Sequence, residues 1–430
     1  MPLQTNQINK TISNTIYALL SIFVLSKGAL YFRDSYGFLE MNFHQSVGYN
    51  SVLKIITAIF NDNFEIPLVF IQLLMLILAS QHIINTIKSI FNPNYVWLLL
   101  FQIIILSPAL HLHFVANAIL SEGLAYPLFL FFVSLLLRAF IMEIKKYYYY
   151  ALFVLFFLIL VRGQFIAMTL VALILVGIDV FRSRLNKENL TLIVVVVLLP
   201  FVSELVEKSF NKIVYNHFES TPFDNVSIIT AAYFVSDAED YSIFENKEEQ
   251  QFFKNVYRVL DSLNLTKEKV KFDYRMYEVF HRNYSYICNY SIHDKGMLYY
   301  EAKGLNKNEQ LLAVNEISGR MLFPLIKDNF KPWLKLYIDN LKNAFGSFKQ
   351  LLLYLVLLLA SCILLIKKNN IILKFIFVTM LLVFANKMII PIAVHSIKRY
   401  MFYTDWIIIT IIILLLNEIF TKNTIVDDRG

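Results

Sequence analysis

Cysteine and glycine are both scarce in this sequence of 430 residues, which contains 2 cysteines and 11 glycines. Cys288 lies in a polar stretch and Cys362 in an apolar run, so they offer neither a disulfide framework nor a thiolate metal cluster of the usual spacing. The few glycines form no glycine-rich loop of the kind that cradles nucleotide phosphates. These absences argue against redox chemistry, a zinc site and a nucleotide-sugar donor.

Charged residues are also scarce. They make up 17% of the chain and hydrophobic residues 57%, whereas soluble domains average roughly 25% and 45–50%. A soluble chain of this length would form about two or three domains, and there are too few polar residues here to cover them. The net charge of +7 is scattered at segment ends and does not form the basic patch of a nucleic-acid-binding protein. The excess apolar residues must therefore face membrane lipids, and no nucleic-acid partner is expected.

Apolar runs of about 20 residues, the length that crosses a hydrocarbon core about 30 Å thick, recur between clusters of charge. We count about ten of them. They fall near residues 13–32, 67–89, 95–113, 117–140, 147–161, 165–181, 189–206, 348–366, 371–390 and 402–419. The fifth run is short, and we interpret it and the sixth as two segments separated by Arg162-Gly163-Gln164. The sequence thus predicts an all-α polytopic membrane protein with about ten transmembrane helices.

The distribution of Lys and Arg predicts the orientation, because short loops rich in these residues stay in the cytoplasm. With the N-terminus inside, the inner loops carry Lys88, Arg138, Lys145, Lys146, Arg182, Lys367 and Lys368, among others. Both termini are then cytoplasmic in a multi-pass protein of the inner or plasma membrane. Two long segments lie outside, the first outer loop 33–66 and the region 207–347. We therefore divide the chain into 1–206, an extracytoplasmic region 207–347, and 348–430.

The region 207–347 has the polar composition of a segment that folds in water. Residues 248–263 place apolar side chains at helical intervals, which predicts an amphipathic helix, and 51–60 follow the same pattern in the first outer loop. A further helix is expected over 326–345, where Pro332 indicates a helix start or a kink. Its Trp333, Tyr337 and lysines are typical of a helix at a membrane surface. We therefore expect the extracytoplasmic region to be mainly helical.

Two carboxylates stand out near the outer membrane surface. Asp34 follows the first apolar run, with Arg33 before it and Glu40 after it. It is either a solvated loop carboxylate or a general base held at a helix end. Glu122 lies a few residues inside an apolar run, where an ionised group requires either a charged partner or a functional role. Both carboxylates are therefore candidates for a functional site.

His111 and His113 precede Glu122 and raise the question of a metal ion. On an extended chain the two histidines would share one face, and on a helix they would not. We interpret them as interfacial histidines and expect no cofactor and no metal ligands, while a divalent metal bound with Glu122 stays an alternative.

Basic residues on the outer side break the charge rule that orients the rest of the chain. They are Arg162, Lys387, His395, Lys398 and Arg399. Short outer loops normally lack Lys and Arg, so these residues call for a compensating anion. Lipid headgroups are one source of that anion. The phosphate of a lipid-linked substrate is the other, since guanidinium groups bind phosphate oxygens bidentately.

These residues resemble, in their order along the chain, the type C glycosyltransferases, polytopic enzymes that use polyprenyl- or dolichyl-phosphate sugars. Asp34 is similar to the acidic residue of that family's first outer loop, although Asp34-Ser35 stands where Asp-Glu is commoner. SEGLAYPLFL around Glu122, LVRGQF around Arg162 and KRYMFYTDW around Arg399 resemble three further features of such enzymes. Within that family the chain is similar to the protein mannosyltransferase and aminoarabinose transferase group.

The resemblance implies an integral membrane glycosyltransferase of cell-envelope glycan or glycolipid assembly. Asp34 would be the catalytic base of an inverting transfer from a polyprenyl-phosphate sugar to a glycan, lipid or protein acceptor. The residues expected to bind substrate are Arg33, Glu40, Glu122, Arg162, Lys398, Arg399 and Tyr400. A polysaccharide polymerase or ligase and a flippase or transporter of lipid-linked sugars are the alternatives, and a purely structural membrane subunit is a third.

Overall fold

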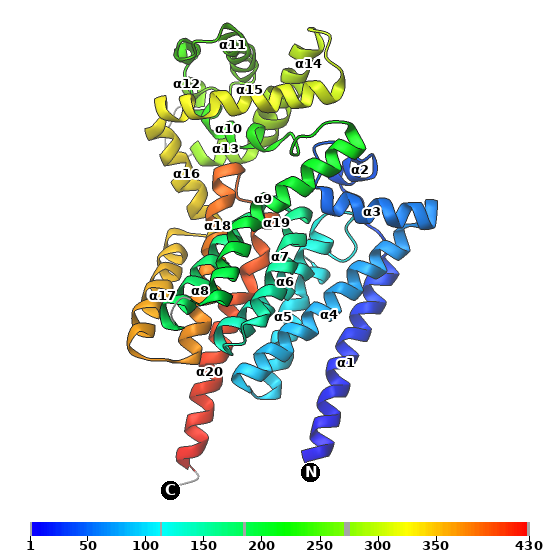
Figure 1. Cartoon of the computed structure of the whole chain (residues 1–430), viewed down its shortest axis with the longest axis vertical. Helices are drawn as coiled ribbons and strands as arrows, with labels where there is room; N and C mark the ends of the chain where they lie inside the picture. Colours follow the sequence, from blue (N-terminus) through cyan, green and yellow to red (C-terminus); the bar gives the residue numbers. More distant parts are fainter. Residues whose placement is uncertain (1, 112–113, 184–185, 271–275, 428–430) are drawn as a thin grey trace. The chain divides into compact units, whose positions relative to one another are not determined.

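The computed structural model describes residues 2–111, 114–183, 186–270 and 276–427, and in these ranges 84% of the chain is helical with no β-strand. The only extended pairing of the backbone in those ranges is an isolated parallel bridge between Leu30 and Ala118. The predicted all-α class is therefore confirmed (Figure 1).

The chain folds into two compact units. The first comprises residues 1–206, 354–386 and 401–430, and the second comprises residues 207–353 and 387–400. The second unit thus contains the whole of the polar region 207–347 and also takes in the short segment that carries Lys398 and Arg399.

The first unit is a bundle of mostly apolar helices. Its elements are α1 (Pro2–Lys27), α2 (Arg33–Leu39), α3 (Val47–Phe60), η1 (Asn61–Asn63), α4 (Glu65–Phe91), α5 (Tyr95–Leu110), α6 (Glu122–Ile141), α7 (Lys146–Val161), η2 (Gly163–Ala167), α8 (Met168–Ser183), η5 (Phe402–Thr404) and α20 (Asp405–Asp427). Four further helices have residues in both units: α9 (Lys187–Tyr215), α17 (Phe348–Lys367), α18 (Ile371–Ala393) and α19 (Lys398–Met401).

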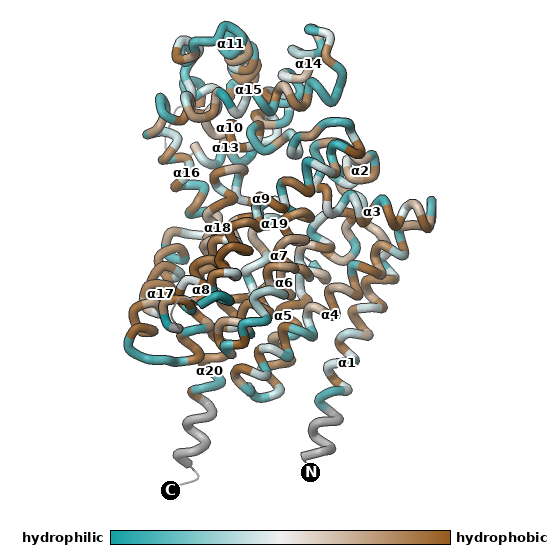
Figure 2. The backbone as a smooth tube through the Cα atoms, viewed as in Figure 1, coloured by the Kyte–Doolittle hydropathy of each residue, from teal (hydrophilic) through white to brown (hydrophobic). Residues whose placement is uncertain are grey.

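Helix α6 forms the centre of this bundle. It is apolar on every side, and 83% of its most apolar window is buried, mainly against α4 and α7. Helix α17 is equally apolar, yet only 6% of its window is buried (Figure 2). An uncovered apolar helix is stable where hydrocarbon replaces water, so α17 indicates a lipid-facing surface.

Each of the ten predicted apolar runs overlaps a helix of the structure, although the bounds differ and the helices vary in length. Among the residues that the structure describes, seven helical segments are long and apolar enough to cross a membrane. They are Glu65–Phe91, Glu122–Ile141, Gly163–Arg182, Lys187–Tyr215, Phe348–Lys367, Ile371–Ala393 and Lys398–Ile419. Helices α5 and α7 are apolar but shorter, and α1 is not among the seven. These helices indicate a membrane protein, and the count of ten crossings stays a prediction.

The second unit is a helical domain with a core of its own. Its elements are α10 (Asp224–Val235), η3 (Ala238–Ile243), α11 (Lys247–Ser262), α12 (Lys267–Val270), α13 (Met276–Ser285), η4 (Tyr286–Asp294), α14 (Lys295–Glu301), α15 (Lys307–Asp328) and α16 (Phe330–Ala344). Helix α11 matches the helix predicted over 248–263, and its Phe252, Phe253 and Leu260 are buried in this core. Pro332 lies in the first turn of α16, where its missing N–H costs nothing, so it marks a helix start.

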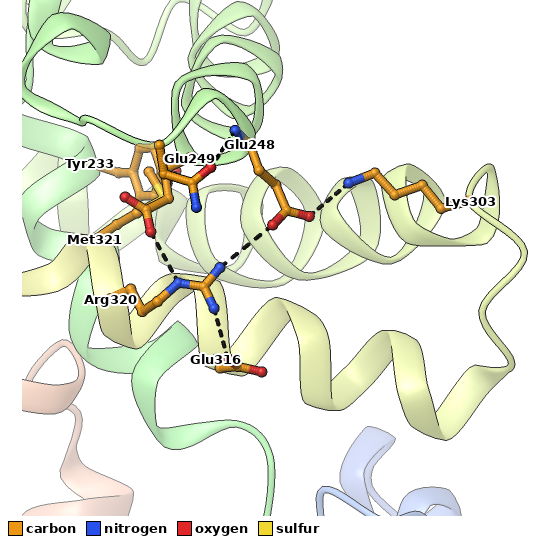
Figure 3. Close-up of polar contacts among 8 residues, drawn as sticks. Tyr233, Glu248, Glu249, Lys303, Glu316, Arg320 and Met321 are labelled. Carbon is orange, nitrogen blue, oxygen red and sulfur yellow. Dashed lines mark hydrogen bonds and ion pairs between the residues drawn. The ribbon is translucent and has the colours of Figure 1, made fainter.

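An ion network around Arg320 joins α11, α15 and the turn after α14 in the second unit (Figure 3). Its guanidinium contacts Glu249 at 3.0 Å and Glu248 at 3.6 Å on α11, and Glu316 at 2.7 Å on its own helix α15. Lys303, which follows α14, reaches Glu248 at 2.7 Å. Hydrogen bonding to Lys303 lowers the pKa of Glu248, so the carboxylate stays charged at neutral pH. The network fixes the position of α11 against α15.

Replacing Arg320 by Gln is expected to lower the free energy of unfolding of the second unit by about 1 kcal/mol, since exposed ion pairs contribute little singly but more as a network. Chemical denaturation of the full chain in detergent, followed by hydrogen exchange of α11, measures the effect. The matched control is Arg282→Gln, which removes a single exposed pair with Glu278 at 4.0 Å. Equal losses in the two variants would contradict a network contribution.

Candidate functional site

A buried ion pair joins two of the residues singled out in the sequence. Arg162 Nη1 lies 2.8 Å from Glu122 Oε1, and the exposed fractions of the two side chains are 11% and 1%. Burying two charges is costly unless they are paired and further hydrogen-bonded. Arg162 and Glu122, 40 residues apart in sequence, therefore form one neutral unit.

Further polar groups hold the guanidinium of Arg162. Its Nη1 donates to Ser121 Oγ at 3.2 Å, and its Nε donates to Gln164 Oε1 at 2.8 Å. Gln164 in turn donates from Nε2 to Asn386 Oδ1 on α18 at 3.0 Å. The ring of Tyr403 lies 5.9 Å from the guanidinium carbon, within the range of a cation–π contact. The pair is thus the centre of a network drawn from four parts of the first unit.

The break between α7 and η2 places Arg162 in this network. Helix α7 ends at Val161, and Arg162 is extended, with φ −157° and ψ 107°. Gly48 of α3 lies directly against this point, because a Cβ built there would be 2.7 Å from the carbonyl carbon of Leu160 and from the amide nitrogen of Val161. A side chain at residue 48 would push α3 away from the end of α7. The interruption predicted from the sequence at Arg162-Gly163-Gln164 is confirmed as the end of one helix.

Tyr49 and Gln72 form a second polar layer beside Glu122. Both are fully buried, and Tyr49 Oη donates to Gln72 Oε1 at 3.3 Å. Burial, together with the negative charge of Glu122, holds the pKa of Tyr49 well above its usual value, so its hydroxyl stays protonated. Gly123 is required here, because a Cβ would be 2.1 Å from Gln72 Oε1.

Gln72 also ties α4 to the segment that leads into α6. Its Nε2 donates to the carbonyls of Ala116 and Ala118 at 3.1 and 3.2 Å. The position of Glu122 at the start of α6 is therefore fixed from two sides.

The segment that leads into α2 is bonded to the same stretch of chain. Leu30 N donates to Asn117 O at 2.8 Å, which forms the bridge between Leu30 and Ala118. Asn117 Nδ2 donates to the carbonyls of Val24 and Gly28, both at 2.7 Å. The chain entering α2 and the chain entering α6 therefore run side by side.

Asp34 lies in the first turn of α2, four residues after Leu30, just as Glu122 lies four residues after Ala118. Arg33, Asp34 and Glu40 are all exposed. The predicted base therefore lies on a short surface helix whose start is tied to the start of α6.

The predicted residues Lys398, Arg399 and Tyr400 belong to the second unit, so they are described apart from Asp34, Glu122 and Arg162. Lys398 is exposed, whereas Arg399 and Tyr400 are half-buried, and the guanidinium carbon of Arg399 lies 6.0 Å from the ring of Tyr400. Lys387, one of the basic residues expected on the outer side, is buried and donates to Ala344 O at 3.1 Å.

His395 contributes no charge to this loop at neutral pH. Burial and the neighbouring His281 lower the pKa of His395 from its ordinary value of 6.5 to about 4. Its ring stacks on Tyr284 with centroids 4.4 Å apart, and its Nδ1 lies 3.1 Å from His281 O. Tyr284 and Tyr277 donate to the carbonyls of Ala393 and Ser396. Helix α13 thus holds the segment that leads to Arg399.

The described residues contain no cluster of three or more His, Cys, Asp or Glu side chains that could hold a metal ion. His111 is exposed at the end of α5, and His113 lies outside the described residues. Glu122 is paired with Arg162 and buried, which leaves its carboxylate no access to a metal ion in water.

Glu122 and Arg162 stand out in the sequence, but the uncharged residues around them do not. Ser121, Gln164 and Tyr403 contact Arg162, Asn386 accepts from Gln164, and Tyr49 and Gln72 form the adjacent polar layer. Gln72 and Asn386 each interrupt a strongly apolar run, and a lone amide in such a run is the signal that would have found them.

Comparisons of the chain with models of protein families, with curated proteins and with solved structures found no match.

Replacing Glu122 by Leu should lower the free energy of unfolding by about 3–5 kcal/mol, because it leaves the Arg162 charge buried without its counter-ion. Combining Glu122→Leu with Arg162→Leu removes both charges, so the double variant should be more stable than the sum of the single losses predicts. Thermal unfolding in detergent measures all three variants. Strictly additive losses would mean that the pair does not act as a unit.

Lowering the pH from 6.5 to 4 should loosen the segment around His395. The pKa of His395 is lower in the folded protein than in the unfolded one, so between pH 6.5 and 4 the unfolded segment binds more protons. The stability that depends on neutral His395 is therefore present above pH 6.5. It is lost toward pH 4, by up to about 3 kcal/mol. Hydrogen-exchange protection factors of residues 394–400 report the change. His395→Phe keeps a ring that can stack on Tyr284 but cannot titrate, so a pH dependence that persists in this variant would assign it to another group.

Proposed function

We propose that this protein is an integral membrane glycosyltransferase that moves a sugar from a polyprenyl-phosphate donor to an acceptor hydroxyl outside the cytoplasm. The observation that carries the proposal is the buried pair of Glu122 and Arg162, two residues chosen independently from the sequence as parts of one site. An ionised pair with this many hydrogen-bond partners inside an apolar bundle supports a functional role more than a stabilising one, since apolar residues would pack the same space at less cost.

The reaction assigns Asp34 the role of general base. Its carboxylate accepts the proton of the acceptor hydroxyl while that oxygen forms a bond to the anomeric carbon of the sugar. The bond from this carbon to the donor phosphate breaks, and its electrons leave on the polyprenyl phosphate. The anomeric configuration is inverted in such a single displacement.

Glu122 and Arg162 act in this proposal as a positioning unit. They are neutral as a pair, so they add no net charge to the bundle, and they fix the start of α6, beside which the chain enters α2. Arg33 begins α2 and Glu40 directly follows it. On the strength of the sequence, Arg399, supported by Arg162, stays a predicted ligand of the donor phosphate, and Lys398 and Tyr400 stay predicted substrate-binding residues.

The proposed topology has about ten crossings, cytoplasmic termini and an extracytoplasmic region 207–347. Seven of the described helical segments meet the length and hydropathy of a span. Helices α1, α5 and α7 would supply the others. The protein would then act in cell-envelope glycan assembly from the outer face of the inner or plasma membrane.

Replacing Asp34 by Asn tests the proposal, because the amide is nearly isosteric and cannot accept the proton. Turnover should fall by a factor of order 10² or more, with folding and donor binding retained. Transfer of labelled sugar from a polyprenyl-phosphate donor in proteoliposomes measures it.

Glu40→Gln is the matched control, since Glu40 is an exposed carboxylate next to the same helix. It should keep near-normal turnover. If Asp34→Asn stays active while Glu40→Gln does not, the base is Glu40. If the wild-type chain binds the donor and carries it across the bilayer without transfer, the protein is a flippase.

A further inference from the structure

Helix α16 presents three distinct sides. Leu336, Asn340 and Ala344 are buried against the second unit. Next to this side runs an apolar stripe of partly exposed side chains, which we call the α16 stripe: Phe330, Trp333, Leu334, Tyr337, Ile338 and Leu341. Its aromatic rings are stacked, with Trp333 and Tyr337 centroids 5.8 Å apart and their planes at 10°. Phe330 and Ile338 are 51% and 41% exposed.

Lysines border the stripe on its far side. At 100° per residue, Lys331 and Lys335 lie next to the stripe and away from the buried side, and both are exposed. Lys342 follows on the same line and pairs with Asp339 at 2.8 Å. An apolar stripe with aromatic rings and a bordering row of lysines is the pattern of a helix that lies in a membrane interface.

The ends of two candidate spans set the level of α16 relative to a membrane. Along the chain, only residues 345–347 separate the end of α16 from the start of α17, the candidate span with the least protein cover. Within the second unit, α16 is bonded to the last turns of α18: Tyr337 donates to Met388 O, Asn340 donates to Pro391 O, and Lys387 donates to Ala344 O. In the proposed topology α17 and α18 cross the bilayer, so their ends lie at its surface, and α16 lies at the same level.

We propose that the α16 stripe docks on the headgroup layer of an anionic lipid bilayer, with its apolar side chains at the acyl boundary and Lys331 and Lys335 on lipid phosphates. The chain continues from α16 into a candidate span after three residues, so a bilayer surface is the partner within reach of the stripe, and its lipid phosphates complement the lysines.

Docking of α16 also fixes the depth of the segment that carries Lys398 and Arg399. Asn340 donates to Val394 O at 2.9 Å and accepts from Ser396 N at 2.8 Å, and Ser396 Oγ donates to Asn340 O. The same residue therefore ties the membrane-docked helix to residues 394–396. The contact of α16 with the lipid surface thus determines how far residues 394–400 lie from the membrane, whatever reaction the protein performs.

Spin labels at two positions of α16 test the proposal in the full-length protein in lipid nanodiscs. In a Cys288→Ala, Cys362→Ala background, one label replaces Ile338 in the stripe. The other replaces Asn343, an exposed residue about 140° away around the helix. Collision with oxygen, which concentrates in lipid, and with a water-soluble nickel chelate is measured by electron paramagnetic resonance.

The label at residue 338 should show a several-fold higher ratio of oxygen to nickel accessibility than the label at 343. Equal ratios would overturn the docking, because both sides would then face water. Exclusion of both reagents from residue 338 would also overturn it, since a protein would then cover the stripe. Neither result depends on sugar transfer, so failure here is distinct from failure of the proposed reaction.

The lipid charge is tested by comparing phosphatidylcholine nanodiscs with nanodiscs that also contain phosphatidylglycerol. The oxygen-to-nickel ratio at residue 338 should rise in the anionic membrane, and Lys331→Gln combined with Lys335→Gln should abolish the rise. An unchanged ratio in the unsubstituted chain would overturn the anionic preference. A rise that persists in the double variant would overturn the role of the two lysines.

Discussion

The ion pair of Glu122 and Arg162 is the constraint on which the first unit depends. Two charges in an apolar bundle are tolerated only with full hydrogen bonding, and the partners come from α6, the turn after α7, and α18. The same region is tightly packed, because Gly48 of α3 lies against the end of α7 and Gly123 of α6 lies against Gln72 of α4. The apolar packing around the ion pair constrains the helix positions less than the pair does, because aliphatic side chains can pack in many arrangements.

The second unit is organised by a different interaction, the attachment of residues 387–400 to α13 and α16. Asn340 makes backbone bonds to this segment, and Tyr284 stacks on His395. The ends of two apolar helices are thereby included in a domain whose core is otherwise drawn from residues 226–336. This attachment explains why the compact unit does not end where the polar composition ends. A change in the protonation of His395 would act on the same segment.

The helical elements follow closely from the sequence because apolar periodicity and length are local properties. Residues 248–263 and the break at Arg162 are examples, since both are encoded within a few turns of helix. The candidate site can be predicted from the sequence only in part. Glu122 and Arg162 stood out because charge is rare in apolar runs, but their pairing depends on packing of α6 against α7. Gln164 and Asn386 carry no charge, and His395 is neutral because of burial, which no local pattern encodes.

The length of α7 has a consequence for the lipid around it. Its 16 residues rise about 24 Å, whereas a hydrocarbon core is about 30 Å thick. In the proposed topology, a helix that begins at one surface with Lys146 would bring Arg162 to a level several ångströms below the other surface. The ion pair with Glu122 would let the guanidinium lie at that level without water. Thinner bilayers would match such a helix with less deformation than thick, sterol-rich ones.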